Sequence, residues 1–415
     1  MNLTLNNIAK VYQANIDIDG ITVIAGYNGT GKSTISKSLY AMLSAQNGLL
    51  SRVSSERQRA IYNVIYRWSV QFINSNNVTL KHLDFGNNIH KQIQNMDDRS
   101  EFTLDTLNKI VEGQKPNDIN IDYGSVKNLY EDLKTEMNAE SNRYISLILR
   151  KEFYNIFRGQ VNTLGKTTEG EVFLNIDDNK SYVVFTDNEI KDMQTGFNEF
   201  NPIYISSHNL LDDISDRRLP RRINRNLYDT RLLDMLTKNE DNIIAPDFYN
   251  QKQRSGIFDD ILQSIVKGHI EINGKNIGYV ENDKVPPVEF SNLASGIKPF
   301  IILKTLIKNG SLKENGMLIY DEPEVNLHPE WQIKLAELIV LLYKELKVRV
   351  LINSHSPYFV RAIEFFCDKY RIVNDSNYYF MRQNYSMGMC SSENVKNNLS
   401  NIYNTMQRPF EEIVF

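Results

Sequence analysis

The residues with the clearest chemistry lie near the N-terminus and read Gly26-Tyr27-Asn28-Gly29-Thr30-Gly31-Lys32-Ser33-Thr34. They fit the pattern G-x-x-x-x-G-K-[ST], in which glycines let backbone N–H groups approach phosphate oxygens closely. Lys32 can neutralise charge on the β- and γ-phosphates, and the Ser33 hydroxyl can bind Mg²⁺. We therefore expect this loop to bind a nucleoside triphosphate together with Mg²⁺.

Two carboxylates follow an apolar run much later in the chain. Met317-Leu318-Ile319-Tyr320 leads directly into Asp321 and Glu322, which is typical of a buried strand that ends at the edge of a sheet. In nucleotide-hydrolysing folds such a strand lies beside the one that leads into the phosphate-binding loop. Asp321 would then lie near Mg²⁺, and Glu322 could polarise the attacking water. The alternative is a strand end with two solvated acids.

Two further segments could contact phosphate. His355 follows the expected strand Val348–Ile352, and a histidine at the carboxyl end of such a strand can sense the γ-phosphate. Ser295 and Gly296 precede a helix expected from Pro299 to Ile307, and a helix N-terminus attracts anions. Because the chain has one phosphate-binding loop, we expect this second helix end to complete the nucleotide site of another copy of the chain.

The patterns around these residues predict the elements that position them. Three strands are expected within residues 1–25, and the third leads into the phosphate-binding loop and a helix. Residues 51–165 have mostly helical periodicity, and five apolar residues form one helical face. These are Ile61, Val64, Ile65, Trp68 and Phe72. Strands are expected again in a hairpin at 171–185, at 202–205 and in a second hairpin at 269–277.

Charge and composition narrow the function classes. The net charge is −4, so the chain as a whole has no basic signature of nucleic-acid binding. A cluster of arginines is either a helical face offset by nearby aspartates or a docking surface for nucleic acid or an acidic partner. Its members are Arg217, Arg218, Arg221, Arg222, Arg225 and Arg231. Two cysteines are too few for a disulfide framework. With no signal region and no apolar run of about 18 residues, we expect a cytoplasmic protein that does not enter a membrane.

The order of the motifs resembles that of the ABC-type ATPase superfamily. The phosphate-binding loop is followed by Leu-Ala-Ser-Gly-Ile, by Asp-Glu-Pro-Glu-Val-Asn-Leu-His-Pro and by Asn-Ser-His-Ser-Pro. More narrowly, the chain is similar to the soluble OLD-like and SMC-like ATPases, including those of bacterial anti-phage systems such as Septu, PARIS and ATPase-containing retrons. The resemblance covers roughly residues 1–48 and 200–370.

This resemblance implies a fold and an organisation. The fold would be an α/β, ABC-type P-loop NTPase with a mixed central sheet, N-terminal antiparallel strands and a helical insertion. Residues 1–48 would form the first part of the ATPase core, 49–165 the insertion, 166–375 the second part of the core, and 376–415 a C-terminal tail.

The resemblance also implies roles for the matching residues. ATP would be the nucleotide, bound by residues 28–34 with Mg²⁺ at Ser33 and Asp321, while Glu322 and His355 would be catalytic. Ser295 and Gly296 would act on the ATP of a partner in a head-to-tail dimer. Ala294 replaces the usual serine of this segment, so Ser295 must supply the hydroxyl. In place of the usual metal-sensing glutamine we find only His208-Asn209, and Tyr12 is the candidate for stacking on adenine.

Three functions remain open at this stage. The first is a regulatory ATPase of an anti-phage complex, which controls a separate nuclease or toxin, because the chain has no H-x-x-E-H string of a metal-dependent hydrolase. The second is a DNA-repair ATPase that acts directly on DNA. The third is a nucleotide-gated scaffold with little turnover. A membrane transporter ATPase fits the motifs least well.

Overall fold

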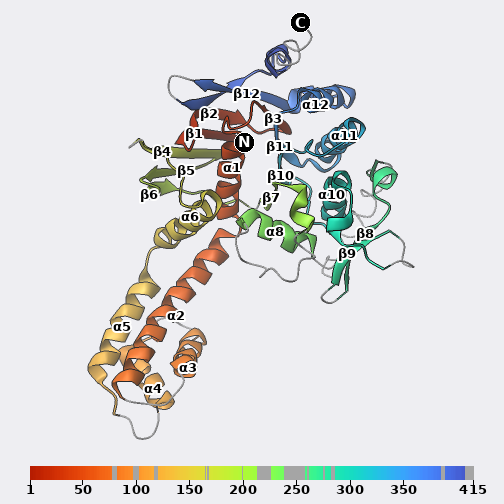
Figure 1. The fold of residues 1–415 in the computed structure, drawn as a ribbon. Coiled ribbons are helices and arrows are strands. Elements are labelled where there is room, and N and C mark those ends of the chain that lie inside the picture. The colour runs from red at the N-terminus through yellow and green to blue at the C-terminus, as the bar shows by residue number, and fades with distance from the viewer. Residues whose placement is uncertain are drawn as a thin grey trace. The chain divides into compact units, whose positions relative to one another are not determined.

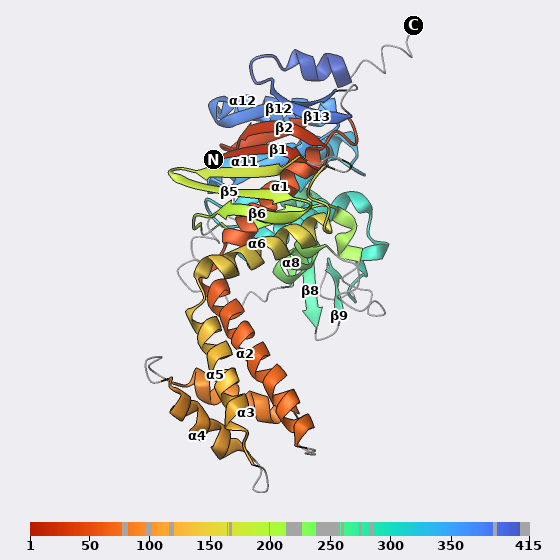
Figure 2. The same cartoon turned by 90° about the vertical axis from the view of Figure 1, so that its left-hand side faces the viewer.

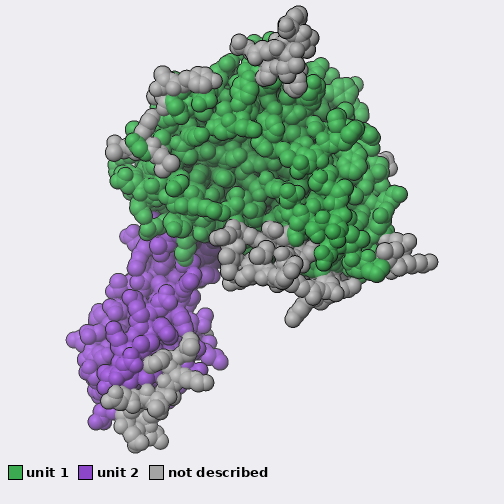
Figure 3. Space-filling view, in the orientation of Figure 1, with its two compact units in different colours: residues 1–47, 149–415 green, residues 48–148 purple. Residues whose placement is uncertain are grey.

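The computed structural model describes residues 1–76, 82–96, 102–115, 120–163, 165, 168–198, 200–212, 226–237, 258, 261–273, 276–281, 286–384 and 388–406. The chain forms two compact units, which Figure 3 distinguishes by colour. Unit 1 contains Met1–Asn47 and Leu149–Phe415, and unit 2 contains Gly48–Ile148. We expected the helical insertion at residues 49–165, whereas the chain returns to unit 1 in the middle of helix α6 (Ser141–Phe157).

Unit 1 is built on a mixed sheet of eleven strands in the order β6-β5-β4-β1-β2-β13-β12-β3-β11-β10-β7, and Figure 2 shows most of these strands stacked in this order. The strands are β1 (Asn2–Ile8), β2 (Val11–Asp17), β3 (Ile21–Ala25), β4 (Gly170–Ile176), β5 (Asn179–Thr186), β6 (Glu189–Gln194), β7 (Pro202–Ile205), β10 (Met317–Asp321), β11 (Arg349–Ser354), β12 (Ser376–Asn384) and β13 (Met389–Asn394). β8 (His269–Asn273) and β9 (Asn276–Val280) form a separate hairpin.

The register of the parallel strands determines where the site forms. β11 pairs in parallel with β3 on one side and with β10 on the other. Ser354 lies opposite Ala25, and Asn353 lies opposite Asp321. Because carboxyl ends of parallel strands meet at one edge, the phosphate-binding loop after β3 lies beside the residues that follow β10 and β11.

Helices cover both faces of this part of the sheet. Helix α1 (Lys32–Gln46) contacts β10, β11 and β7 on one face. Helices α10 (Lys298–Lys308), α11 (Pro329–Leu346) and α12 (Pro357–Lys369) contribute to one apolar core that includes Leu318 and Tyr320 of β10. Figure 1 shows these three helices side by side next to β10, β11 and β3. Since strand side chains alternate between faces, Asp321 points toward the side of α1.

Unit 2 is helical in its described part. It contains α2 (Leu49–Ser75), α3 (His82–Gln94), α4 (Leu104–Gln114), α5 (Tyr123–Asn138) and the first residues of α6. Trp68, Phe72 and Phe85 stack on one another, and the indole N–H of Trp68 donates a hydrogen bond of 2.8 Å to Ser125. The predicted apolar face of α2 is confirmed, because all five of its residues are buried. None of the helices in the described ranges has the length and apolar character that crossing a bilayer requires.

The α/β class with a mixed sheet, N-terminal antiparallel strands and a helical insertion is confirmed, and so are both predicted hairpins and the strand at 202–205. We expected a C-terminal tail at residues 376–415, whereas the described residues of this segment include β12 and β13 of the sheet. β12 pairs directly with β3, and its residues Ser376–Met381 are all buried, as in a central strand that is covered on both faces.

Candidate functional site

The phosphate-binding loop connects β3 to α1 with a backbone that needs glycine. Gly26, Gly29 and Gly31 have φ values of 156°, 77° and 89°. At Gly31 a β-carbon would also lie 2.8 Å from Val11 Cγ2 of β2, so a larger residue would both strain and displace the loop. Tyr27, Asn28 and Gly29 are exposed, and no side chain caps α1. The first N–H groups of this helix are therefore directed at a site that favours an anion.

Lys32 begins α1 and folds back over the loop. Its Nζ donates hydrogen bonds to the carbonyl oxygens of Gly26 (2.8 Å) and Tyr27 (2.9 Å), and only 4% of the residue is exposed. Burial lowers the pKa of Lys32, while the charges of Glu322, Glu324 and Asp321 act in the opposite direction. The lysine predicted to bind phosphate thus lies within electrostatic range of the carboxylate that ends β10 and of the two that follow it.

Asp321 is held by several hydrogen bonds at the end of β10. Its carboxylate accepts hydrogen bonds from the Tyr204 hydroxyl (2.5 Å) and from the Asn353 amide. Burial raises the pKa of Asp321, and the hydrogen bonds from Tyr204, Asn353 and Ser33 oppose this effect. Carboxylate and hydroxyl oxygens are donors that suit Mg²⁺, which binds one or two carboxylates and completes its shell with phosphate and water. Asp321 and Ser33 therefore fit the predicted metal site.

Glu322, Glu324 and His355 form a cluster beside Asp321. Glu322 has a left-handed φ of 47°, and its N–H donates a hydrogen bond of 2.9 Å to the Asn353 carbonyl. A positive φ at a non-glycine residue is strained, and such strain is common at functional sites. Glu322 Oε1 lies 3.3 Å from His355 Nδ1, and both side chains are more than a third exposed. The structure thus brings together the two residues that we predicted to be catalytic.

Ser295 and Gly296 lie on the other side of the sheet from α1. They form a short 3₁₀ helix (Ser295–Ile297) directly before α10. Ser295 is exposed, whereas a β-carbon on Gly296 would lie 3.1 Å from the Trp331 ring and 3.4 Å from the Asn326 carbonyl. The nearby Lys298 is buried and forms an ion pair of 2.6 Å with Asp212. Glycine is therefore needed at 296 for close packing, while Ser295 is available to a partner.

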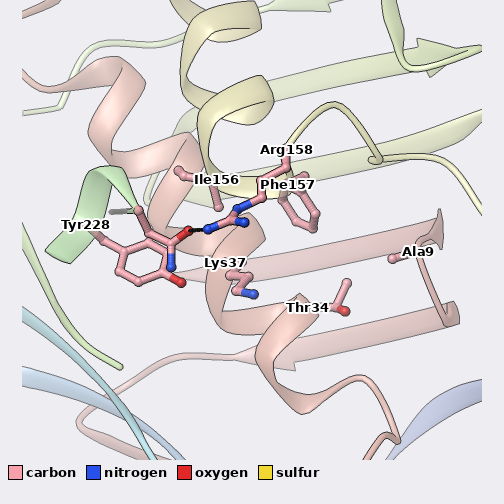
Figure 4. A pocket seen from close by; sticks show the side chains of 8 residues that line it. Ala9, Thr34, Lys37, Ile156, Phe157, Arg158 and Tyr228 are labelled. Atoms are coloured by element: carbon pink, nitrogen blue, oxygen red, sulfur yellow. Dashed lines mark hydrogen bonds between the residues drawn. The ribbon is translucent and has the colours of Figure 1, made fainter. Parts of the chain in front are cut away.

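A pocket of about 370 Å³ lies next to the phosphate-binding loop. It is lined by Ala9, Thr34, Lys37, Ile156, Phe157, Arg158, Asn226 and Tyr228. Figure 4 shows Thr34 and Lys37 of α1 together with Phe157 and Arg158 at the end of α6. The Arg158 guanidinium donates a hydrogen bond of 3.3 Å to the Asn226 side chain. Sequence analysis missed this pocket; the left-handed φ of 53° at Arg158 is a local feature with no sequence signal.

Other predicted residues lie elsewhere. His208 of the 3₁₀ helix His208–Leu211 is buried and shares a hydrogen bond of 2.7 Å with the Tyr320 hydroxyl, on the face of the sheet opposite Asp321. Burial lowers the pKa of His208 to about 4. The half-buried Arg231 forms an ion pair of 2.6 Å with the buried Glu152, so this arginine is already paired within the chain. The other clustered arginines lie outside the described residues. Tyr12 is exposed and does not line the pocket.

The chain is similar to known proteins at the level of a family model and of solved structures. A family model described as an AAA ATPase domain matches residues 1–360. No curated protein matches the sequence. Among solved structures, an SMC head bound to the C-winged helix domain of ScpA is 11% identical, with 95% of this chain and 97% of that chain covered and a TM-score of 0.47. The SMC head domain from Thermotoga maritima is 10% identical, with 95% and 98% covered and a TM-score of 0.39.

Proposed function

This chain belongs to the AAA ATPase domain family, and from this premise we propose that it binds and hydrolyses ATP in a head-to-tail dimer. We further propose that it is the regulatory subunit of a bacterial anti-phage complex and controls a separate nuclease or toxin. One observation carries the ATPase proposal. Lys32 and Ser33 lie within electrostatic or hydrogen-bonding range of Asp321 at the shared edge of β3, β11 and β10, and Glu322 lies 3.3 Å from His355.

The residues divide the chemistry among them. The loop N–H groups and Lys32 bind the β- and γ-phosphates and neutralise part of their charge. Glu322 accepts a proton from the attacking water while the water oxygen bonds to the γ-phosphorus. The bond from that phosphorus to the β–γ bridging oxygen breaks, and ADP and phosphate leave. His355 contacts the γ-phosphate and orients it beside Glu322.

Asp321 and Ser33 would hold Mg²⁺, which when bound neutralises charge on the β- and γ-phosphate oxygens. The chain prepares these ligands itself. Tyr204 and Asn353 fix the Asp321 carboxylate through hydrogen bonds, and Asn353 also donates one of 2.7 Å to Ser36 of α1. Such supporting contacts orient ligands and are often needed for full affinity.

The pocket beside Thr34 supports a nucleotide rather than phosphate alone. A triphosphate bound along the loop would place its α-phosphate near Thr34, so the nucleoside would extend into the adjoining space. The pocket volume falls in the range of small-molecule sites, and Phe157 and Arg158 offer an apolar surface and a cation. We propose that this pocket, rather than Tyr12, receives the ribose and the base.

The exposed Ser295 supports completion of the site by a second copy. In a symmetric dimer the same surfaces are exchanged, so each ATP would lie between the loop of one chain and Ser295–Gly296 of the other. A mixing experiment tests this arrangement. Lys32→Ala removes phosphate binding, and Ser295→Trp blocks the contact from the partner at an exposed position.

Each variant alone should have almost no ATPase activity. An equal mixture should recover about a quarter of the wild-type rate, because about half of the dimers pair one variant with the other and contain one intact site of two. The control for subunit exchange is a mixture of the wild-type chain with the inactive Lys32→Ala,Ser295→Trp double variant. A dimer of these two chains contains no intact site, so exchange should lower the wild-type activity. A mixture that stays inactive while exchange is complete would contradict the shared site.

The regulatory role rests on the resemblance of the motif order to the ATPases of anti-phage systems. The test uses this gene with a neighbouring reading frame that encodes a nuclease or toxin. Cells that carry both should survive phage infection, and Lys32→Ala should abolish protection without loss of the protein. If protection persists in the Lys32→Ala cells, nucleotide binding does not control the effector. ATPase activity that is instead stimulated by DNA at low salt would favour the DNA-repair alternative.

A further inference from the structure

Glu324 is the one buried acid of the cluster formed with Glu322 and His355, and the hydrolysis proposed above gives it no role. Only 4% of its side chain is exposed, compared with 41% for Glu322. Burying a carboxylate is costly unless it is paired and hydrogen-bonded. The contacts of Glu324 therefore indicate which residues this buried carboxylate stabilises.

The contacts of Glu324 lead to the residues at the end of β11. Its Oε1 accepts hydrogen bonds from the Ser354 hydroxyl (2.7 Å) and from the His355 backbone N–H (3.0 Å). The same oxygen lies 3.6 Å from His355 Nδ1. One carboxylate oxygen therefore contacts the strand end, the backbone and the ring of the histidine that we propose to contact the γ-phosphate.

A second carboxylate faces the same ring nitrogen. Glu322 Oε1 lies 3.3 Å from Nδ1, so an exposed acid and a buried acid both lie close to this nitrogen, which makes a hydrogen bond with neither in this structure. Hydrogen bonds of catalytic groups are often long before substrate binds and shorten in the complex. When one ring nitrogen of a histidine donates to a carboxylate, the tautomer is fixed and the other nitrogen is left for the ligand.

We propose that Glu324 is a positioning residue for His355: it holds the Ser354–His355 backbone and keeps the ring with Nδ1 toward the carboxylates, so that Nε2 faces the nucleotide. This inference rests on the proposed ATPase function. Burial raises the pKa of Glu324, and the hydrogen bonds from Ser354 and His355 oppose that effect. The two glutamates then have different roles: Glu322 accepts a proton from water, and Glu324 acts only through His355.

The test is a double-mutant cycle on the full-length chain with Glu324→Gln and His355→Ala. Glutamine retains an oxygen that can accept both hydrogen bonds, so the variant should fold, but it removes the charge that faces Nδ1. For Glu324→Gln we expect kcat for ATP hydrolysis to fall about 10- to 100-fold, as is typical when a residue that orients a functional side chain is replaced. KM should change less than about twofold. In the His355→Ala background Glu324→Gln should have no further effect, because the two residues act as a unit.

Two additional measurements distinguish a positioning role from a general loss of stability. The first is the control variant Glu337→Gln, which changes an acid of α11 that accepts hydrogen bonds from Lys369 and Tyr370. This variant should keep the wild-type kcat. Nitrogen-15 NMR of the histidine ring needs no turnover: His355 should be protonated at Nδ1 in the wild type and should lose this preference in Glu324→Gln.

Equal losses of kcat with and without His355, or a ring tautomer that does not respond to Glu324→Gln, would overturn the inference. If the wild type binds ATP without hydrolysing it, the proposed function fails while the NMR result still decides the role of Glu324.

Discussion

Replacing His208 by glutamine distinguishes a structural histidine from a nucleotide sensor. The order of motifs made His208 the substitute for a metal-sensing residue, whereas the structure puts it on the opposite face of the sheet from Asp321, in a hydrogen bond with Tyr320. Glutamine can keep a hydrogen bond to the Tyr320 hydroxyl but cannot titrate. We therefore expect unchanged ATP affinity and a changed dependence of stability on pH.

The size of the effect follows from the pKa. Burial lowers the pKa of His208 from 6.5 to about 4, a difference that corresponds to about 3 kcal/mol of unfolding free energy. Between these values the unfolded chain binds more protons than the folded protein. The contribution is therefore fully present above pH 6.5 and is lost as the pH falls through 6.5 toward 4, with about 2 kcal/mol gone by a pH of about 5.

The assay is urea unfolding of unit 1 at a pH of about 7.5 and about 5. The chain has two tryptophans, and only Trp331 lies in unit 1, so a Trp68→Phe background makes fluorescence report this unit. The parent should lose about 2 kcal/mol more than His208→Gln over this interval. His269→Gln, at an exposed histidine of β8, is the matched control and should behave as the parent does. Equal losses in the parent and His208→Gln would refute the reasoning.

Three further outcomes follow from the site. Glu322→Gln should bind ATP and hydrolyse it about 100-fold more slowly or worse, because a general base contributes that much, and phosphate release measures this. Arg158→Ala should weaken ATP binding about 10- to 100-fold, the value of one hydrogen bond to a charged group, while the affinity for inorganic triphosphate stays unchanged in calorimetry. Tyr204→Phe removes a donor to Asp321, so the Mg²⁺ concentration needed for half-maximal hydrolysis should rise about 10-fold or more.

The sequence was sufficient for features that are local or periodic. The glycine spacing predicted the turn and helix start at Lys32, and the apolar runs predicted β7 at its observed bounds and β10 to within one residue. What it could not predict are contacts between distant segments. Tyr204 and Asn353 meet at Asp321 only because β7, β10 and β11 pair in one register, and no spacing along the chain encodes that pairing.

The position of β12 shows the same limit. Residues 376–384 carry no motif and follow all the recognisable ones, so they were expected in a tail, yet they pair with the strand that leads into the phosphate-binding loop. Met381 of β12 lies where a β-carbon on Gly26 would be only 3.0 Å away. The shape of the loop therefore depends on a strand more than three hundred residues away in sequence.

The charges around the loop indicate which form of phosphate this edge of the sheet can accept. Three carboxylates, Asp321, Glu322 and Glu324, lie within electrostatic range of Lys32. The charge of each carboxylate favours the charged form of the lysine. A triphosphate that arrives alone would add negative charge to a cluster in which acids already outnumber the lysine, and like charges at short range repel strongly where water is excluded. Phosphate that arrives with Mg²⁺ brings a counter-charge to Asp321. In the proposed function these carboxylates would favour the metal-bound triphosphate over the free anion, so the acids proposed to act on water would also select the form of the substrate.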